Sequence, residues 1–200
     1  MSHLCLQIIR REHEALAAML RSIPLLIAQN RDRPTSPDFS LLRAMLFYVD
    51  EFPEKRHHHK ETELLFPKLR ARTPLHRDLL DQLDQDHACG EVRIRDLEHA
   101  LLAYEVMGEP RRAAFEAKLA KYVDFYLSHM AKEERDILPL AERVLTADDW
   151  IDLDEAFAAN RDPFAGFEPE AEYTALFSRI VGLVPAPIGL GPPLSQQRRA

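Results

Sequence analysis

The sequence is poor in the residues that several protein classes require. It has only two cysteines, Cys5 and Cys89, too few and too far apart for a disulfide framework or a thiolate metal site. No apolar run approaches the roughly 20 residues of a membrane-spanning helix, and the first residues carry charges where a signal peptide would be apolar. We therefore expect reduced thiols and a cytoplasmic protein with no membrane partner.

Clustered positive charge is also missing, and acidic residues outnumber basic ones by 33 to 26. The net charge is −7 and no long basic run occurs, so we expect no nucleic-acid partner. Hydrophobic residues make up 46% of the 200 residues, which is enough to bury a sizeable core. These values predict one main domain with an appendage.

Four long segments show the apolar spacing of helices, and the clusters RDRPTSP, RTP and MGEP separate them. The chain is therefore expected to be all-α. The predicted helices cover residues 2–30 with a bend at Pro24, 38–70 with an interruption at Pro53, 73–107 with Thr73 as cap and Pro74 in the first position, and about 110–145.

The residues after Leu145 form a distinct part of the chain. Thr146, followed by Asp148 and Asp149, predicts a capped short helix through Phe157, and a second short helix is expected over residues 170–183. The tail VPAPIGLGPPLSQQRRA is expected either to run extended over the surface or to fray. The expected domains are a bundle over residues 1–145 and an extension over residues 146–200.

Each predicted core-facing stripe carries a histidine, and two of the stripes also carry a glutamate four residues later, on the same helical face. A single histidine on such a stripe is more often a hydrogen-bonded core residue than a ligand. Six buried ionisable groups must be paired, neutralised or bound to a metal. The pattern therefore predicts a metal site built from His13, His57, Glu61, His87, His129 and Glu133.

At these residues the chain resembles the hemerythrin-like HHE cation-binding family, through REHEAL, RHHHKETELLFP, QDHACGE and SHMAKEERDILP. The resemblance implies an up-down-up-down four-helix bundle that holds two iron ions with an oxo or hydroxo bridge. Carried over by position, it assigns the ligands of one iron to His13 and His57, those of the other to His87 and His129, and the bridges to Glu61 and Glu133.

One departure from the oxygen-carrying hemerythrins concerns the third helix. Those proteins have a second histidine four residues after the first, whereas this chain has Glu91 there. Two imidazoles, two carboxylate oxygens and the bridge would leave each iron five-coordinate and open, which favours redox chemistry or nitric oxide or peroxide binding over oxygen storage. Glu91 would either close one position or stay on the surface as a supporting carboxylate.

Other residues near the predicted ligands are given supporting roles. His58 and His59 are rotated about 100° and 200° from His57 on an α-helix, so we expect them in a solvated or supporting patch. Tyr126 either lines the ligand pocket or is a core aromatic residue. A ferritin-like di-iron site is not favoured because only Glu54-x-x-His57 fits its motif, and no His-Glu-x-x-His zinc motif occurs.

The expected function is a non-haem di-iron protein that binds or senses a small diatomic or peroxide ligand. The extension would report the change or mediate contacts in a homodimer. The alternative is an enzyme that reduces peroxide or nitric oxide, or that supplies iron in iron–sulfur cluster repair. A third possibility is that the metals only stabilise the bundle. The sequence leaves the choice between enzyme and binding protein open.

Overall fold

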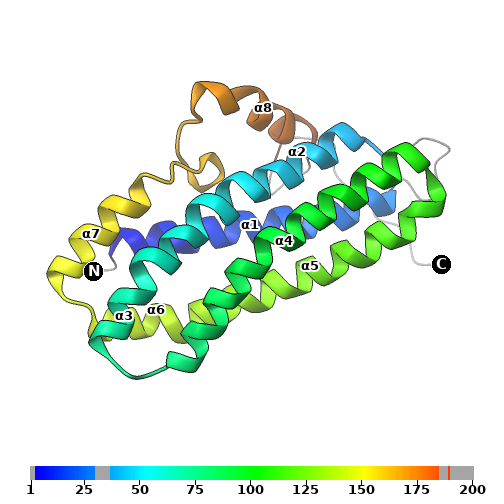
Figure 1. Ribbon diagram of the computed structural model, residues 1–200. Coiled ribbons are helices and arrows are strands. Elements are labelled where there is room, and N and C mark those ends of the chain that lie inside the picture. Colours follow the sequence, from blue (N-terminus) through cyan, green and yellow to red (C-terminus); the bar gives the residue numbers. More distant parts are fainter. Residues whose placement is uncertain (1–2, 30–36, 185–188, 190–200) are drawn as a thin grey trace, which may run out of the picture.

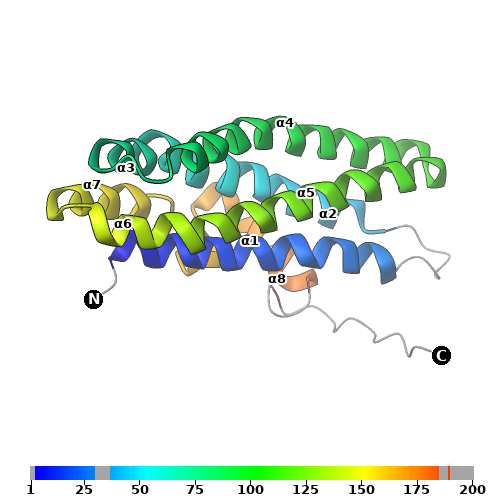
Figure 2. The ribbon, with the colours of Figure 1, turned by 90° about the horizontal axis from the view of Figure 1, so that it is seen from below.

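The computed structural model describes residues 3–29, 37–184 and 189, and their regular secondary structure is entirely helical. Four long rods lie side by side (Figures 1 and 2). The first rod is α1 (Leu4–Gln29), which continues through Pro24. The third rod is α4 (Arg77–Met107), and a 3₁₀ turn at Glu109–Arg111 leads from it toward the fourth rod.

The second and fourth rods mix α-helix with π-helix. The second rod runs from α2 (Phe39–Val49) through π segments at Asp50–His58 and Glu61–Leu65 into α3 (Phe66–Arg72). The fourth rod runs from α5 (Arg112–Lys132) through a π segment at Glu133–Ile137 into α6 (Leu138–Val144). Each glutamate of the two repeated His-x-x-x-Glu patterns therefore opens a π segment.

Prolines accompany all three π segments. Pro53 lies inside the first segment, and Pro67 and Pro139 follow the other two by two residues. A proline has no N–H to donate, and its ring crowds the carbonyl group four residues earlier, so it disfavours the regular α-helical hydrogen-bond pattern, although α1 stays α-helical through Pro24. The predicted interruption at Pro53 is thus a change of helix type, and the rod remains continuous.

The predicted start of the third helix was wrong by one turn. Thr73 is extended, and its hydroxyl accepts a hydrogen bond from the backbone N–H of Leu75 at 3.1 Å. His76 then takes a left-handed conformation (φ 58°), so α4 begins only at Arg77. The threonine therefore caps a local turn, a competing use that threonine hydroxyls commonly find.

Two apolar clusters occupy the interior. One contains Cys5, Ile9, Leu65, Leu83 and Ile137, and the other gathers residues from the opposite end of each rod, including Met19, Met45, Ile94 and Leu119. In the first three rods the predicted ligands lie in sequence between the residues of the two clusters, and in the fourth rod Glu133 does so while His129 lies among the last residues of one cluster, just before Met130. The buried polar groups are therefore enclosed by apolar packing on both sides along the bundle.

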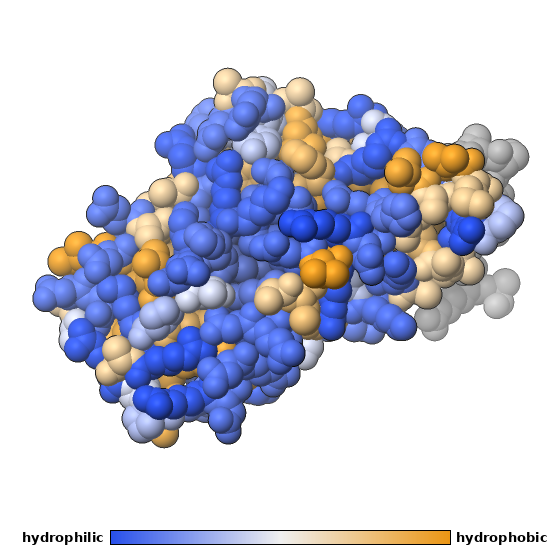
Figure 3. Space-filling view, in the orientation of Figure 1, coloured by the Kyte–Doolittle hydropathy of each residue, from blue (hydrophilic) through white to orange (hydrophobic). Residues whose placement is uncertain are grey.

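The extension covers one side of the rods. Helix α7 (Ala147–Ala158) packs against α1, and α8 (Thr174–Leu183) packs against α2. The face in Figure 3 is mostly hydrophilic, with small separate apolar patches. Within the described part of the chain, no helix has both the length and the apolar character needed to span a bilayer. Most of the predicted extended tail lies outside the described residues.

The predicted cap of α7 is confirmed. Its removal provides a test of how the cap stabilises the extension. The Thr146 hydroxyl accepts from the Asp149 N–H at 3.4 Å, while the Asp149 carboxylate accepts from the Thr146 N–H at 3.0 Å.

Thr146→Ala should lower the free energy of unfolding by about 1 kcal/mol in urea titrations. Thr174→Ala, which removes an exposed hydroxyl at the start of α8, is the control. Equal unfolding midpoints for Thr146→Ala and the unchanged protein would contradict the assigned cap.

Candidate metal centre

The six predicted ligands converge at one place in the interior, and we call them the six-residue site. They come from all four rods, and none exposes more than 7% of its surface. They are His13, His57, Glu61, His87, His129 and Glu133. Sequence reasoning therefore selected six side chains that the fold brings together, whereas their role as ligands stays a prediction.

The four histidines form two pairs. The Nε2 atoms of His13 and His57 lie 3.2 Å apart, and those of His87 and His129 lie 3.0 Å apart. Each pair joins neighbouring rods. This pairing matches the assignment that the family resemblance implies, in which each pair holds one metal ion.

The two carboxylates lie between the pairs. Glu61 Oε2 is 3.3 Å from the Nε2 atom of His57 and 3.5 Å from that of His87. Glu133 reaches His13 at 3.4 Å through Oε2, and reaches His129 at 3.1 Å through Oε1. Each glutamate thus contacts a member of both pairs, which is the placement that a bridging carboxylate needs.

The chemistry of this donor set fits metal ions. Both side chains, Glu61 and Glu133, are 0% exposed, and none of their four oxygens has a hydrogen-bond partner among the described residues. Burying carboxylates without such partners costs several kcal/mol, and a bound cation removes that cost. Imidazole nitrogens together with carboxylate oxygens are the donors that first-row transition metals accept.

The outer nitrogen of every imidazole has a partner too. In all four histidines Nε2 faces the centre and Nδ1 faces an oxygen contributed by another rod, a second layer that fixes ring orientation in metal sites. These contacts are His13 with Glu134 at 3.1 Å, His57 with Glu12 at 2.7 Å, His87 with Thr62 at 2.8 Å and His129 with Asp86 at 3.5 Å.

These four acceptors connect the rods in a closed order. The first rod supplies the acceptor for the second, the second for the third, the third for the fourth, and the fourth for the first. Each acceptor also adjoins a member of the six-residue site in the sequence, as Glu12 adjoins His13 and Asp86 adjoins His87. Sequence analysis did not identify them, although a polar residue beside each predicted ligand was an available signal.

The extension also contributes to this outer layer. The Asn160 side-chain amide donates a hydrogen bond to Glu12 Oε2 at 2.9 Å, and that same oxygen faces His57. Asn160 is 1% exposed and lies two residues beyond the end of α7. One imidazole of the site is therefore oriented through a residue that lies beyond the four rods.

The electrostatics of the site favour bound protons when no cation is present. Burial lowers the pKa of His129, but Glu133 and Asp86 outweigh this and raise it to about 10. Burial likewise opposes the net rise of the His57 pKa, which Glu61 and Glu12 bring well above its usual range. Burial raises the pKa of Glu133, yet His129, His87 and His13 hold it well below its usual range.

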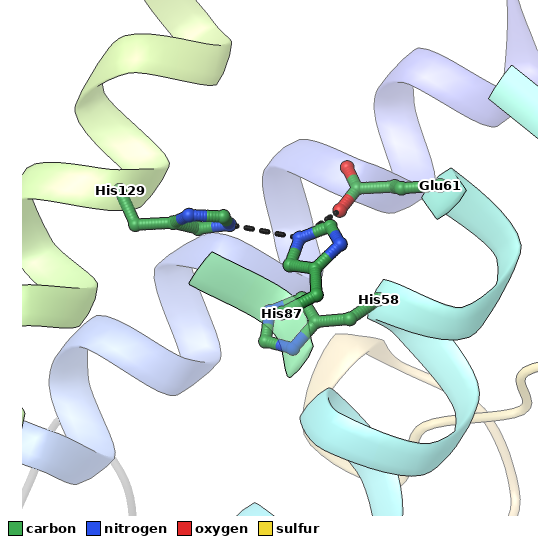
Figure 4. A group of neighbouring side chains, drawn as sticks. All are labelled: His58, Glu61, His87 and His129. Atoms are coloured by element: carbon green, nitrogen blue, oxygen red, sulfur yellow. Dashed lines mark hydrogen bonds and ion pairs between the residues drawn. The ribbon is translucent and has the colours of Figure 1, made fainter. Parts of the chain in front are cut away.

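His58 is not solvated, contrary to one of the two expectations for it. It is 2% exposed, whereas the adjacent His59 is exposed as expected. Figure 4 shows His58 beside Glu61, His87 and His129. The expectation relied on a rotation of 100° per residue, but His57 and His58 end a π segment, whose wider turn separates consecutive side chains by a smaller angle.

Two further residues left open by the sequence now have described partners. Glu91 has a half-exposed side chain (51%) and pairs with Arg95 at 3.3 Å on the surface. Tyr126 is buried, and its hydroxyl donates a hydrogen bond to Glu54. Neither contact involves the six-residue site directly.

Comparison with known proteins identifies the family. The model of the hemerythrin HHE cation-binding domain matches residues 5–141, and the chain belongs to this family. Uncharacterized proteins of Mycobacterium bovis and Mycobacterium tuberculosis are each 25% identical to it over 138 residues, which is 68% of this chain and 54% of the relative. The chain thus spans about half the length of these curated relatives. Membership of the family supports cation binding by the cluster of buried histidines and glutamates.

Metal binding should release protons. Because the pKa of His129 is about 10 in the folded protein, above the usual 6.5, this ring is protonated at pH 7 and must lose its proton before it can bind a metal. Affinity should therefore rise with pH up to about pH 10, roughly tenfold per pH unit for each proton displaced. Calorimetric cobalt(II) titrations in buffers of different ionisation enthalpy measure the release. A binding enthalpy independent of the buffer would contradict it.

The outer layer should tune affinity. Glu12→Gln weakens the acceptor of His57 Nδ1 while nearly preserving volume, and we expect a loss of about tenfold in metal affinity. Glu14→Gln, an exposed change two residues away on α1, is the matched control. Competition with a chromophoric chelator measures both. Equal affinities in the two variants would show that Glu12 does not support the site.

Proposed function

We propose that this protein is a non-haem di-iron protein with the up-down-up-down arrangement of its family, and that it binds or senses oxygen, nitric oxide or peroxide. The observation that carries the proposal is the placement of Glu61 and Glu133, each of which contacts a histidine of both pairs. When bound, two iron ions would supply coordination positions for a small ligand together with one-electron redox chemistry.

The residues around the irons would have three distinct roles. The two histidine pairs would each hold one ion, the two glutamates would join them, and the outer acceptors would keep every Nε2 pointed inward. Next to His13 and His57 lies a cavity of about 10 Å³, whose lining includes Leu16, Phe52 and Pro53. A space of this size has room for about one water molecule, so a small ligand could enter it only by displacing that water, and a bulky substrate could not enter it.

A second candidate is an enzyme that reduces peroxide or nitric oxide. The observation that favours it is a surface pocket of about 300 Å³, lined in part by His58 and His87, which would admit a substrate from solvent. An enzyme needs repeated access for substrate and reductant. A binding protein or sensor needs only a stable adduct.

Metal analysis combined with spectroscopy tests the proposal. The protein reconstituted with iron(II) should hold two irons per chain and form a stable optical adduct with nitric oxide, with no sustained consumption of nitric oxide or peroxide when a reductant is present. His87→Ala should lose iron, whereas His99→Ala, an exposed change on the same helix, should retain it. Sustained turnover would establish the enzyme instead. Failure of the unchanged protein to take up iron would refute both.

A further inference from the structure

We infer that the surface pocket of about 300 Å³ is the route by which a divalent metal ion enters the six-residue site, and that Asp84 and Glu91 bind the ion transiently on its way. This inference rests on the proposed function, since it needs a centre that takes up metal ions. It adds a loading path to that function, with two residues that are not ligands of the filled centre.

The six-residue site is closed to solvent on most sides. Five of its members expose no more than 3% of their surface. A metal ion in water carries a shell of bound water molecules, so it cannot pass between densely packed helices without an opening. His87, at 7%, is the most exposed member of the site, and it forms part of the wall of the pocket.

The pocket differs from two other cavities beside the rods. The cavity next to one histidine pair has a volume of about 10 Å³, room for about one water molecule, so a hydrated ion does not fit there. A cavity of about 270 Å³ between α4 and α5 is lined by three cations, Arg93, Lys118 and Lys121, and one carboxylate, and by no member of the six-residue site. Its net positive charge disfavours the entry of a metal cation.

The charge of the pocket favours cations. Its lining contains three carboxyl groups, those of Glu54, Asp84 and Glu91, and one ammonium group, that of Lys55. Lys55 is already held by two carboxylates of its own rod. A cleft lined mainly by one sign of charge raises the local concentration of ions of the opposite sign and speeds their association. Carboxylate oxygens are also donors that first-row divalent cations accept.

Asp84 and Glu91 lie on either side of His87 along one face of α4. The three residues are spaced at i, i+3 and i+7, which places their side chains on the same face of an α-helix. The exposed fraction of the side chain falls from 51% for Glu91 to 29% for Asp84 and 7% for His87. An ion bound by either carboxylate is therefore about one helical turn from a member of the six-residue site.

Both carboxylates can accept a cation. Asp84 contacts Arg70 through Oδ2 at 2.6 Å, whereas its Oδ1 is buried and has no hydrogen-bond partner among the described residues. Glu91 pairs with Arg95 at 3.3 Å. Exposed ion pairs of this kind contribute little free energy, so a divalent cation can replace Arg95 beside Glu91.

His58 marks the inner end of the route. It lines the pocket, is 2% exposed, and has a ring nitrogen within 4.8 Å of donor atoms of Glu61, His87 and His129 (Figure 4). Its Nδ1 lies 3.2 Å from Glu54, whereas its Nε2 is buried and has no hydrogen-bond partner within the described part of the chain, which needs an explanation. Water molecules that accompany an entering ion would donate hydrogen bonds to this nitrogen. Because the rings of His58 and His87 are stacked with planes 14° apart, one ion does not bind both.

A residue on an entry route differs from a ligand in its effect on kinetics. It contacts the ion during passage, but it contacts neither the ion in solution nor the ion in the filled centre. Its removal therefore slows uptake and release by the same factor and leaves the dissociation constant unchanged. Removal of a ligand of the filled centre instead accelerates release and weakens binding.

Two pairs of variants test the route, one through its charge and one through its width. Glu91→Gln removes a carboxylate of the pocket, and Asp96→Asn, an exposed change on the same helix in the other cavity, is its control. Ala88→Phe narrows the pocket at an exposed position of its lining, and Ala117→Phe, at an exposed position of α5, is its control. The probe is cobalt(II). Stopped-flow absorption measures its uptake by the metal-free protein, and transfer to excess chelator measures its release.

We expect uptake and release to slow about fivefold in Glu91→Gln and about tenfold in Ala88→Phe, with unchanged dissociation constants. Both controls should match the unchanged protein. Equal rates in all variants would overturn the inference and leave the di-metal centre standing. Faster release from Glu91→Gln would also overturn it, because Glu91 would then hold the ion in the filled centre. An unchanged protein that binds fewer than two cobalt ions would refute the centre itself.

Discussion

Two carboxylates without hydrogen bonds, buried in the middle of a helical bundle, are the constraint on which the rest of this structure depends. Glu61 and Glu133 have no exposed surface, and apolar clusters enclose them along all four rods. An interior of this kind is stable only when positive charge lies close to the carboxylates. The imidazoles of His57 and His129, whose pKa values are raised, provide it as protonated rings, and transition-metal cations would provide it more strongly. The stability of the fold therefore depends on the protons or cations bound beside these two carboxylates.

The outer acceptors turn four separate helices into one unit. Because every imidazole of the six-residue site takes its Nδ1 partner from a neighbouring rod, a rotation of one rod disturbs two rings, its own and that of the next rod. Pro67 and Pro139, which follow the π segments at the two glutamates, act in the same direction because each disfavours the regular α-helical pattern there. Local backbone chemistry and long-range contacts thus agree on one register of the four rods, and such consistency across levels characterises sequences that specify a single structure.

Much of this arrangement follows from the sequence, and the exceptions have physical causes. The i, i+4 rule placed His57 with Glu61 correctly because the residues lie within one turn, where small changes of helix type matter little. The rule for adjacent residues misjudged His58, because the π segment changes the rotation per residue. Thr73 was misplaced because a threonine hydroxyl serves a turn as readily as a helix cap. The contact of Asn160 with Glu12 joins residues 148 positions apart, beyond the reach of any periodic pattern.

The contact of Asn160 connects the extension to the interior. Asn160 is the second residue of the turn after α7, and Asp162, two residues later, accepts a hydrogen bond from the buried Tyr48 hydroxyl at 2.7 Å. The turn is therefore anchored at two points, one on Glu12 and one on the second rod. A displacement of α7 away from α1 would loosen Glu12 and, through it, the ring of His57. The extension is thereby connected to the six-residue site through one imidazole, that of His57.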